Sequence, residues 1–207
     1  MSRRLPLYLV LDVSGSMVGA PIQAVNEGLQ TLQLALRRNP QASETVHVSV
    51  ITFGGDVRVE VPLTDVVSFS PPLLRENGST PFGEALQLVT ELAKKDVQIG
   101  QKRDWKPMVF IMTDGAPDPG YESAITEFKK YSWGPVIAFG VGDADINVLK
   151  KVTERVCSLD TMDPAQMADM FKWLSTATVK MSQKIDTVGG AAVEDELEEL
   201  PVGISFV

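Results

Sequence analysis

Short apolar runs alternate with longer amphipathic segments along this chain, and this alternation limits the possible folds more than any other feature. The first run, residues 5–11 (LPLYLVL), is too short to span a membrane and has no polar face. A strand of this kind must be covered on both faces. Residues 21–38 follow, with Ile22, Val25 and Leu29 at the three- and four-residue spacings of an amphipathic helix.

The same alternation continues to the end of the longest helical pattern. We expect further strands at residues 46–53, 57–63, 108–113, 135–141 and 156–159, and further helices at residues 82–97, 121–131, 146–154 and 164–185. This order predicts an α/β fold: a doubly wound, mostly parallel sheet with helices on both faces. The turn Gly54-Gly55-Asp56 predicts a hairpin, and therefore one antiparallel strand at an edge of the sheet.

The 207 residues divide by composition into one domain, residues 1–186, and a tail, residues 187–207. The tail contains a run of acidic residues at 194–199 and ends in an apolar stretch. A solvated acidic tail is one interpretation. The alternation at the apolar end also fits a short strand, or an apolar clamp on the body of the protein or on a partner.

Charge and composition exclude several classes of protein. The net charge of −8 argues against nucleic acid as a partner, because phosphate binding requires clustered Lys and Arg. The single cysteine, Cys157, excludes an internal disulfide or a Cys-cluster metal site, and the single histidine, His47, excludes histidine-rich metal sites. No apolar run is long enough for a membrane span. Because the first apolar run reads as a strand and not as an export signal, we expect a cytoplasmic protein.

In folds of this kind, ligands bind at the carboxyl ends of the strands. Several side chains that carry oxygen atoms lie at these ends of the predicted strands. Asp12, Ser14 and Ser16 follow the first strand, Thr80 precedes the helix that begins near residue 82, and Asp114 follows strand 108–113. Carboxylates and hydroxyls suit a hard divalent cation, Mg²⁺ first, with Mn²⁺ or Ca²⁺ as alternatives. We expect these side chains to lie on an exposed edge and not in the core.

Each piece alone also has a structural explanation. The segment from Asp12 to Ser16 fits a turn that satisfies its own backbone, Thr80 fits a helix cap, and Asp114-Gly115 is an ordinary turn pair. Their joint occurrence at successive strand ends favours a metal site.

Catalytic alternatives fit the same residues less well. A dehalogenase-like phosphatase requires a second aspartate at the position of Ser14, and no G-x-S-x-G or P-loop motif is present. His47 falls within a predicted strand, and Cys157 reads as a buried apolar residue. We therefore expect no catalysis. A metal-dependent hydrolase or phosphatase that uses the same site remains the alternative.

The pattern Asp12-x-Ser14-x-Ser16, with Thr80 and Asp114, resembles the metal-ion-dependent adhesion site of von Willebrand factor type A domains. The resemblance covers roughly residues 5 to 185, and all five ligand positions match. Within that family the chain looks most like the bacterial TerY type associated with tellurium resistance, through the start Ser-Arg-Arg-Leu-Pro and the segments 78–81 and 113–118.

The resemblance implies the roles of these residues. Ser14, Ser16 and Thr80 would bind the cation by their hydroxyls, and Asp12 and Asp114 directly or through waters. A carboxylate of a partner protein would complete the coordination shell. The resemblance further implies a role in a tellurite or metal-stress response, with a protein kinase and a phosphatase among the partners.

Overall fold

The computed structural model of the chain describes residues 3–100, 103–159, 163–184 and 205–207. Its strands are β1 (Leu5–Asp12), β2 (Val46–Phe53), β3 (Val57–Asp65), β4 (Met108–Thr113), β5 (Val136–Val141), β6 (Val156–Leu159) and β7 (Ser205–Phe206). Its helices are the 3-10 helix η1 (Gly15–Met17) and the α-helices α1 (Ala20–Arg38), α2 (Pro40–Thr45), α3 (Phe82–Asp96), α4 (Glu122–Lys130), α5 (Ile146–Val152) and α6 (Pro164–Lys184).

The strands form one sheet in the order β3-β2-β1-β4-β5-β6-β7. All neighbouring pairs from β2 to β6 are parallel, and β3 pairs antiparallel with β2 at one edge. The predicted fold class is therefore confirmed. The sheet has one addition at its other edge, where the apolar end of the chain forms β7 and pairs antiparallel with β6. Of the interpretations of that end, the short strand is the one that the structure shows.

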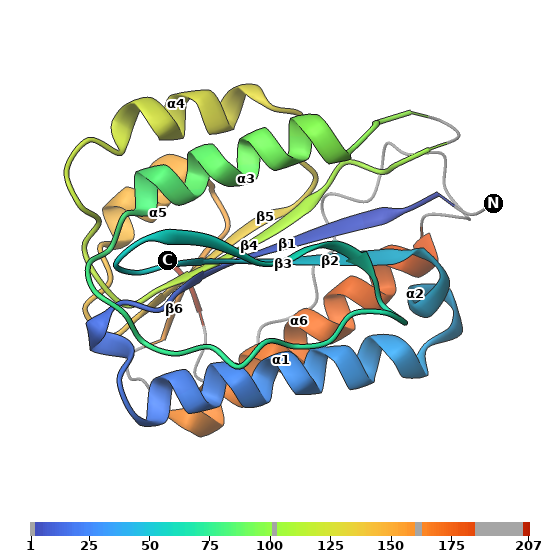
Figure 1. Cartoon of the computed structure of the whole chain (residues 1–207), viewed down its shortest axis with the longest axis horizontal. Coiled ribbons are helices and arrows are strands. Elements are labelled where there is room, and N and C mark those ends of the chain that lie inside the picture. Colours follow the sequence, from blue (N-terminus) through green and yellow to red (C-terminus); the bar gives the residue numbers. More distant parts are fainter. Residues whose placement is uncertain (1–2, 101–102, 160–162, 185–204) are drawn as a thin grey trace.

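Helices cover both faces of the sheet, with α1, α2 and α6 on one face and α3, α4 and α5 on the other (Figure 1). The long apolar strands are buried throughout because each faces a hydrophobic layer on both sides. Helices α1 and α6 pack closely at Gly28, where a Cβ atom would lie 2.1 Å from the Phe171 ring. Only glycine fits there without movement of the ring.

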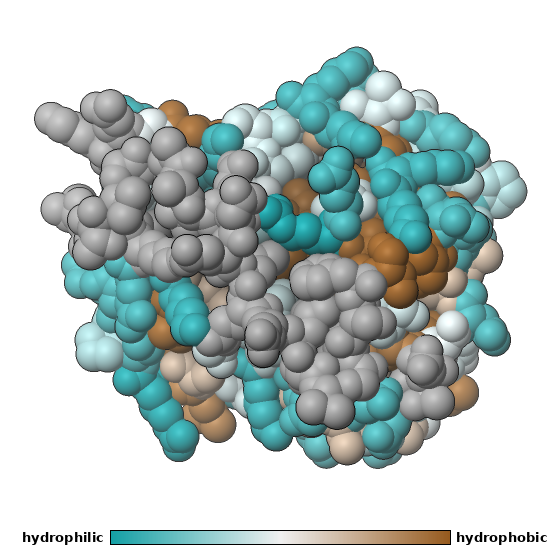
Figure 2. Space-filling view, turned by 180° about the vertical axis from the view of Figure 1, so that it is seen from behind, coloured by the Kyte–Doolittle hydropathy of each residue, from teal (hydrophilic) through white to brown (hydrophobic). Residues whose placement is uncertain are grey.

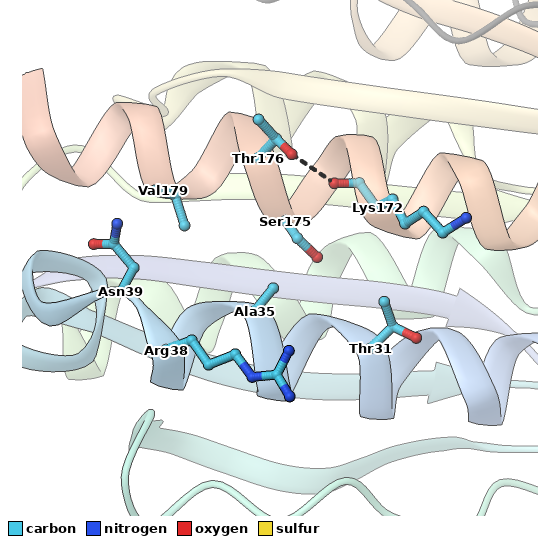
Figure 3. A pocket seen from close by; sticks show the side chains of 8 residues that line it. All are labelled: Thr31, Ala35, Arg38, Asn39, Lys172, Ser175, Thr176 and Val179. Atoms are coloured by element: carbon cyan, nitrogen blue, oxygen red, sulfur yellow. Dashed lines mark hydrogen bonds between the residues drawn. The ribbon is translucent and has the colours of Figure 1, made fainter.

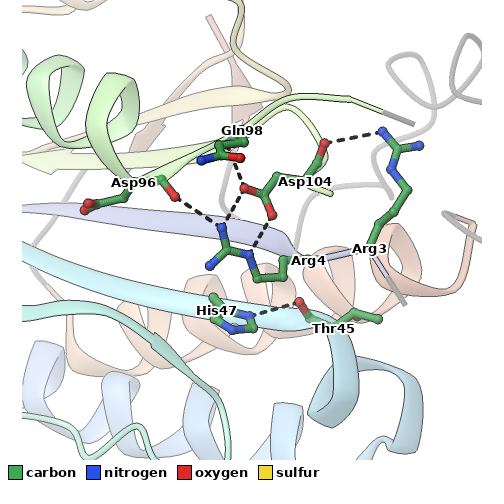
Figure 4. Close-up of polar contacts among 7 residues, drawn as sticks. All are labelled: Arg3, Arg4, Thr45, His47, Asp96, Gln98 and Asp104. Carbon is green, nitrogen blue, oxygen red and sulfur yellow. Dashed lines mark hydrogen bonds and ion pairs between the residues drawn. The ribbon is translucent and has the colours of Figure 1, made fainter. Parts of the chain in front are cut away.

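Arginines anchor the beginning of β1 at the amino end of the sheet (Figure 4). The Arg4 guanidinium donates to both carboxylate oxygens of Asp104, each at 2.6 Å, and the Gln98 N–H donates to Oδ2 at 2.7 Å. The Arg3 guanidinium stands 3.5 Å from the centre of the Trp105 ring. These contacts fix the loop before β4 to the start of the chain, and they leave Trp105 half-buried.

From behind, the described surface is mostly hydrophilic, with hydrophobic side chains gathered in an area right of centre (Figure 2). Among the described residues, no helix has the length and apolar character that crossing a bilayer requires.

Candidate metal centre

Three loops meet at the carboxyl edge of the sheet, on the left in Figure 1. Strands β1 and β4 are direct neighbours in the sheet although β2 and β3 lie between them in the chain. Their ends therefore bring Asp12 and Asp114 to one place. The loop before α3 joins them through a hydrogen bond from the Gly15 N–H to the Gly78 carbonyl, at 3.0 Å.

Both oxygens of Asp12 accept hydrogen bonds that fix its carboxylate. Oδ1 accepts from the Ser14 N–H at 2.8 Å, and Oδ2 accepts from the Thr113 hydroxyl at 2.6 Å. Thr113 was absent from the predicted set. Its position directly before Asp114, at the last residue of β4, is the sequence signal that would have indicated it.

The two serine hydroxyls converge on the second carboxylate. Ser16 Oγ donates to Asp114 Oδ1 at 2.8 Å, and Ser14 Oγ lies 3.4 Å from the same oxygen. The two hydroxyl oxygens are 3.1 Å apart. The structure thus brings Asp12, Ser14, Ser16 and Asp114 into one hydrogen-bonded cluster.

Thr80 completes the predicted set from the third loop. Its carbonyl accepts from the Asp118 N–H at 3.0 Å, which joins the loops after β4 and before α3. Its hydroxyl lies beside the backbone that follows Asp114, since a Cβ atom on Gly115 would be 3.7 Å from Thr80 Oγ1. The loops that carry all five predicted residues are therefore in contact.

The expectation of an exposed edge was wrong for most of these side chains. Asp12 is 0% exposed, Ser14 3% and Asp114 2%, and only Ser16 is open to solvent. The strand ends stop below the surface because the loops fold over them. Burial raises the pKa of Asp12, although hydrogen bonds from Ser14 and Thr113 oppose the rise. Burial also raises the pKa of Asp114, and the charge of Asp143 adds to it.

The chemistry of this cluster fits a hard cation. Asp114 Oδ2 is buried and has no hydrogen-bond partner, which is costly unless an external group binds it. Across the described residues, no group of three or more His, Cys, Asp and Glu side chains is placed to hold a metal. A cation at this edge would therefore need the hydroxyls of Ser14, Ser16 and Thr80 besides the two carboxylates, as oxygen-preferring ions allow.

The chain's other reactive groups lie away from this cluster. His47 is the second residue of β2, at the amino end of the sheet, and its Nδ1 lies 3.3 Å from the Thr45 carbonyl. Burial lowers the pKa of His47 and raises the pKa of the buried Cys157 thiol to about 12. Cys157 is therefore buried, as the sequence predicts, and its raised pKa keeps the thiol protonated.

A separate hollow of about 440 Å³ lies between α1 and α6 (Figure 3). The hydroxyls of Thr31, Ser175 and Thr176 bond to carbonyls of their own helices, and Lys172 pairs with Asp169 at 3.0 Å. These lining groups already have partners within the protein, so the hollow offers a weaker site than the carboxyl edge.

Comparison with known proteins agrees with this architecture. Residues 7–171 match the family model of the von Willebrand factor type A domain. A von Willebrand factor type A protein from Catenulispora acidiphila superposes with a TM-score of 0.66 at 18% identity, over 86% of this chain and 43% of that one. Proximal thread matrix protein 1 from the mussel byssus, in a structure described as having a zinc-occupied MIDAS motif, gives 0.62 at 18% identity, over 86% and 48%.

The BatB protein from Bacteroides thetaiotaomicron superposes with a TM-score of 0.55 at 16% identity, over 87% of this chain and 99% of that one. The chain spans less than half the length of the first two proteins, so their full activities are not carried over to it. At these identities the superpositions support the fold, and the family match covers most of the chain. The chain belongs to the von Willebrand factor type A domain family.

Proposed function

We propose that the protein is a metal-ion-dependent protein-binding module. Asp12, Ser14, Ser16, Thr80 and Asp114 would hold one divalent cation, Mg²⁺ first, with Mn²⁺ or Ca²⁺ as alternatives. The observation that carries the proposal is the buried, unpartnered Asp114 Oδ2 beside two converging serine hydroxyls. The zinc-occupied MIDAS motif of the mussel protein, which shares this fold, supports a bound cation and leaves the choice of ion to experiment.

The donor set supports binding in preference to catalysis. When bound, the cation supplies a Lewis-acidic position that a carboxylate from another protein can occupy. The hydroxyls of Ser14, Ser16 and Thr80 add no negative charge, so such a cation keeps its attraction for an outside Asp or Glu. The hydrogen bonds on Asp12 hold its carboxylate in place.

We further propose that the protein is not an enzyme. His47 and Cys157, the chain's histidine and cysteine, lie away from the cluster and are not poised as base or nucleophile. The cytoplasmic location, the TerY type, the role in a tellurite or metal-stress response, and the kinase and phosphatase partners rest on the family resemblance of the sequence. They are proposals of the same kind.

Calorimetric titration with Mn²⁺ tests the metal site. The double variant Ser14→Ala/Ser16→Ala should lose detectable binding and keep its far-UV circular dichroism, because the Asp12 contacts to the Ser14 N–H and to Thr113 remain. Ser70→Ala/Ser132→Ala, two exposed serines in other loops, is the matched control and should bind normally. Unchanged affinity in Ser14→Ala/Ser16→Ala would overturn the assignment.

A panel of phosphate and ester substrates in Mg²⁺ separates binding from catalysis. No turnover above that of Ser14→Ala/Ser16→Ala is expected. Turnover by the wild type that disappears in this variant would favour the hydrolase alternative.

A further inference from the structure

Acidic side chains surround the candidate metal centre. Glu76 and Asp118 lie in loops that build the centre, Asp143 and Asp145 lie in the loop between β5 and α5, and we call these four residues the acidic rim. The first three are exposed, and Asp145 is half-buried.

Each rim residue is tied to the centre by a contact or by its neighbours. The Asp118 N–H donates to the Thr80 carbonyl, and the charge of Asp143 acts on Asp114. Asp145 lines a small cavity together with Thr113 and Gly115, the residues on either side of Asp114. Glu76 precedes Asn77, whose N–H donates to the carbonyl of Val13 in the loop after β1.

Little positive charge balances the rim. The loops at 13–19, 114–121 and 142–145 contain no Lys or Arg, and Arg75 is the one cation in loop 75–81. In contrast, the last turns of α1, α3 and α4 carry two basic residues each, and these helices end at the opposite edge of the sheet, whereas Lys151 near the end of α5 stands 5.6 Å from the Tyr121 ring. Among the described residues, the loops that carry the rim therefore hold more negative than positive charge.

The buried, unpartnered Asp114 Oδ2 marks this edge as a binding site independently of the rim. The negative charge of the rim then affects which partner carboxylates can approach the cation. An acidic partner surface would bring like charges together around the one carboxylate that the cation attracts, whereas a basic surface would be drawn in.

We propose that the acidic rim selects a protein partner whose metal-binding Asp or Glu stands within a basic surface. The inference rests on the proposed function, since it concerns the surroundings of the same cation. The partner is thus recognised by two opposite charges: a carboxylate for the cation, and flanking Lys or Arg for Glu76, Asp118, Asp143 and Asp145.

Two synthetic peptides test the selection. Each has one central aspartate between glycines, flanked by lysines in one peptide and by glutamates in the other. Each is titrated into isotopically labelled full-length protein and followed by NMR, in Mg²⁺ and in chelator. In Mg²⁺ the lysine-flanked peptide should bind at least about tenfold more tightly, and its advantage should shrink between about 0.05 and 0.3 M salt.

Rim variants show whether these aspartates cause the preference. Asp118→Asn/Asp143→Asn should reduce the ratio of the two affinities to within about threefold. The matched control Glu91→Gln/Glu154→Gln removes two exposed acids elsewhere and should keep the wild-type ratio. Equal affinities for the two peptides, or an unchanged ratio in the rim variant, would overturn the inference. If both peptides bound equally well in Mg²⁺ and in chelator, the proposed function would be contradicted instead. The ratio of the two peptide affinities would still test the role of the rim.

Discussion

Aspartates are buried at both ends of the parallel strands, which we call the amino edge and the carboxyl edge of the sheet. Among the described residues, the negative charge is compensated within the protein at the amino edge and is not compensated at the carboxyl edge. At the amino edge, Asp104 is 1% exposed, and Arg4 neutralises it with a two-pronged ion pair. Burial alone would raise the pKa of Asp104, but the hydrogen bonds from Arg4 and the Gln98 N–H outweigh it and lower the pKa. At the carboxyl edge, Asp12 and Asp114 are buried to a similar degree with raised pKa values.

The two edges differ in whether a side chain of the protein supplies a positive charge to the buried aspartate. Within the described part of the chain, Asp12 and Asp114 accept hydrogen bonds from hydroxyl and amide groups and form no ion pair. A buried carboxylate without a cation costs stability. The amino edge is thus complete by itself, whereas the carboxyl edge gains from a cation that comes from outside.

Metal addition should have the largest effect. With Mg²⁺ at about 100 times its Kd, the free energy of unfolding should rise by about 2.7 kcal/mol. In a domain of this size that corresponds to a rise in Tm of roughly 5–10 °C, measured by thermal unfolding against chelator. Ser14→Ala/Ser16→Ala should show no rise. An equal rise in that variant would place the stabilising ion elsewhere.

Arg4→Met should make the amino edge resemble the carboxyl edge. It leaves Asp104 buried without its cation, and because Arg4 is 40% exposed we expect a loss of about 2 kcal/mol, below the full cost for a buried pair. Urea unfolding measures it. The control Arg58→Met breaks an ion pair whose side chains are 61% and 52% exposed, and should leave stability unchanged. Equal effects of the two variants would contradict the asymmetry.

Acid should selectively weaken the amino edge. Because the pKa of Asp104 is lower in the folded state than its ordinary value of 3.8, its contribution is complete above that value and is lost as pH falls through the folded pKa. The stability difference between wild type and Asp104→Asn should therefore shrink as the pH falls below about 3.8, and it should be constant above about pH 6. A difference that stays constant below about pH 3.8 as well would refute the assigned shift.

The carboxyl edge should show the opposite sign in chelator. A raised folded-state pKa of Asp114 means that stability is lost as pH rises through that pKa, so Asp114→Asn removes a penalty at neutral pH. We expect the metal-free variant to be more stable than wild type by about 0.5 kcal/mol, and to gain nothing from Mg²⁺. A metal-free variant less stable than wild type would show that the Asp114 charge is already compensated.

Periodicity located most elements, because long buried runs and amphipathic stripes are local properties. Strand 46–53 and helix 164–185 match β2 and α6 closely. Helix α2 was missed: its six residues are too few for a periodic pattern, and its signal is the Asn39 side chain that caps the N–H of Ala42.

The sequence predicted that the loops carrying the candidate metal-binding residues would meet, and it did not predict the environment in which they meet. Motif spacing placed Asp12 and Asp114 at strand ends, and the pairing of β1 with β4 brings them together. Burial, the Thr113 contact and the unpartnered oxygen of Asp114 depend on how the loops cover those ends. Such contacts join residues about a hundred positions apart, which no local pattern records.

Strand β3 has a consequence for self-association. Among the described residues no strand pairs with its outer edge, and such an edge is the usual template for aggregation by strand addition. The strand carries Arg58, Glu60 and Pro62, and its pairing with β2 shifts register between Val48 and Ile51. Charge, proline and irregular pairing all hinder a second chain from docking there, and β7 at the other edge has only two residues. Within the described part of the chain, these features therefore hinder edge-to-edge polymerisation of the sheet.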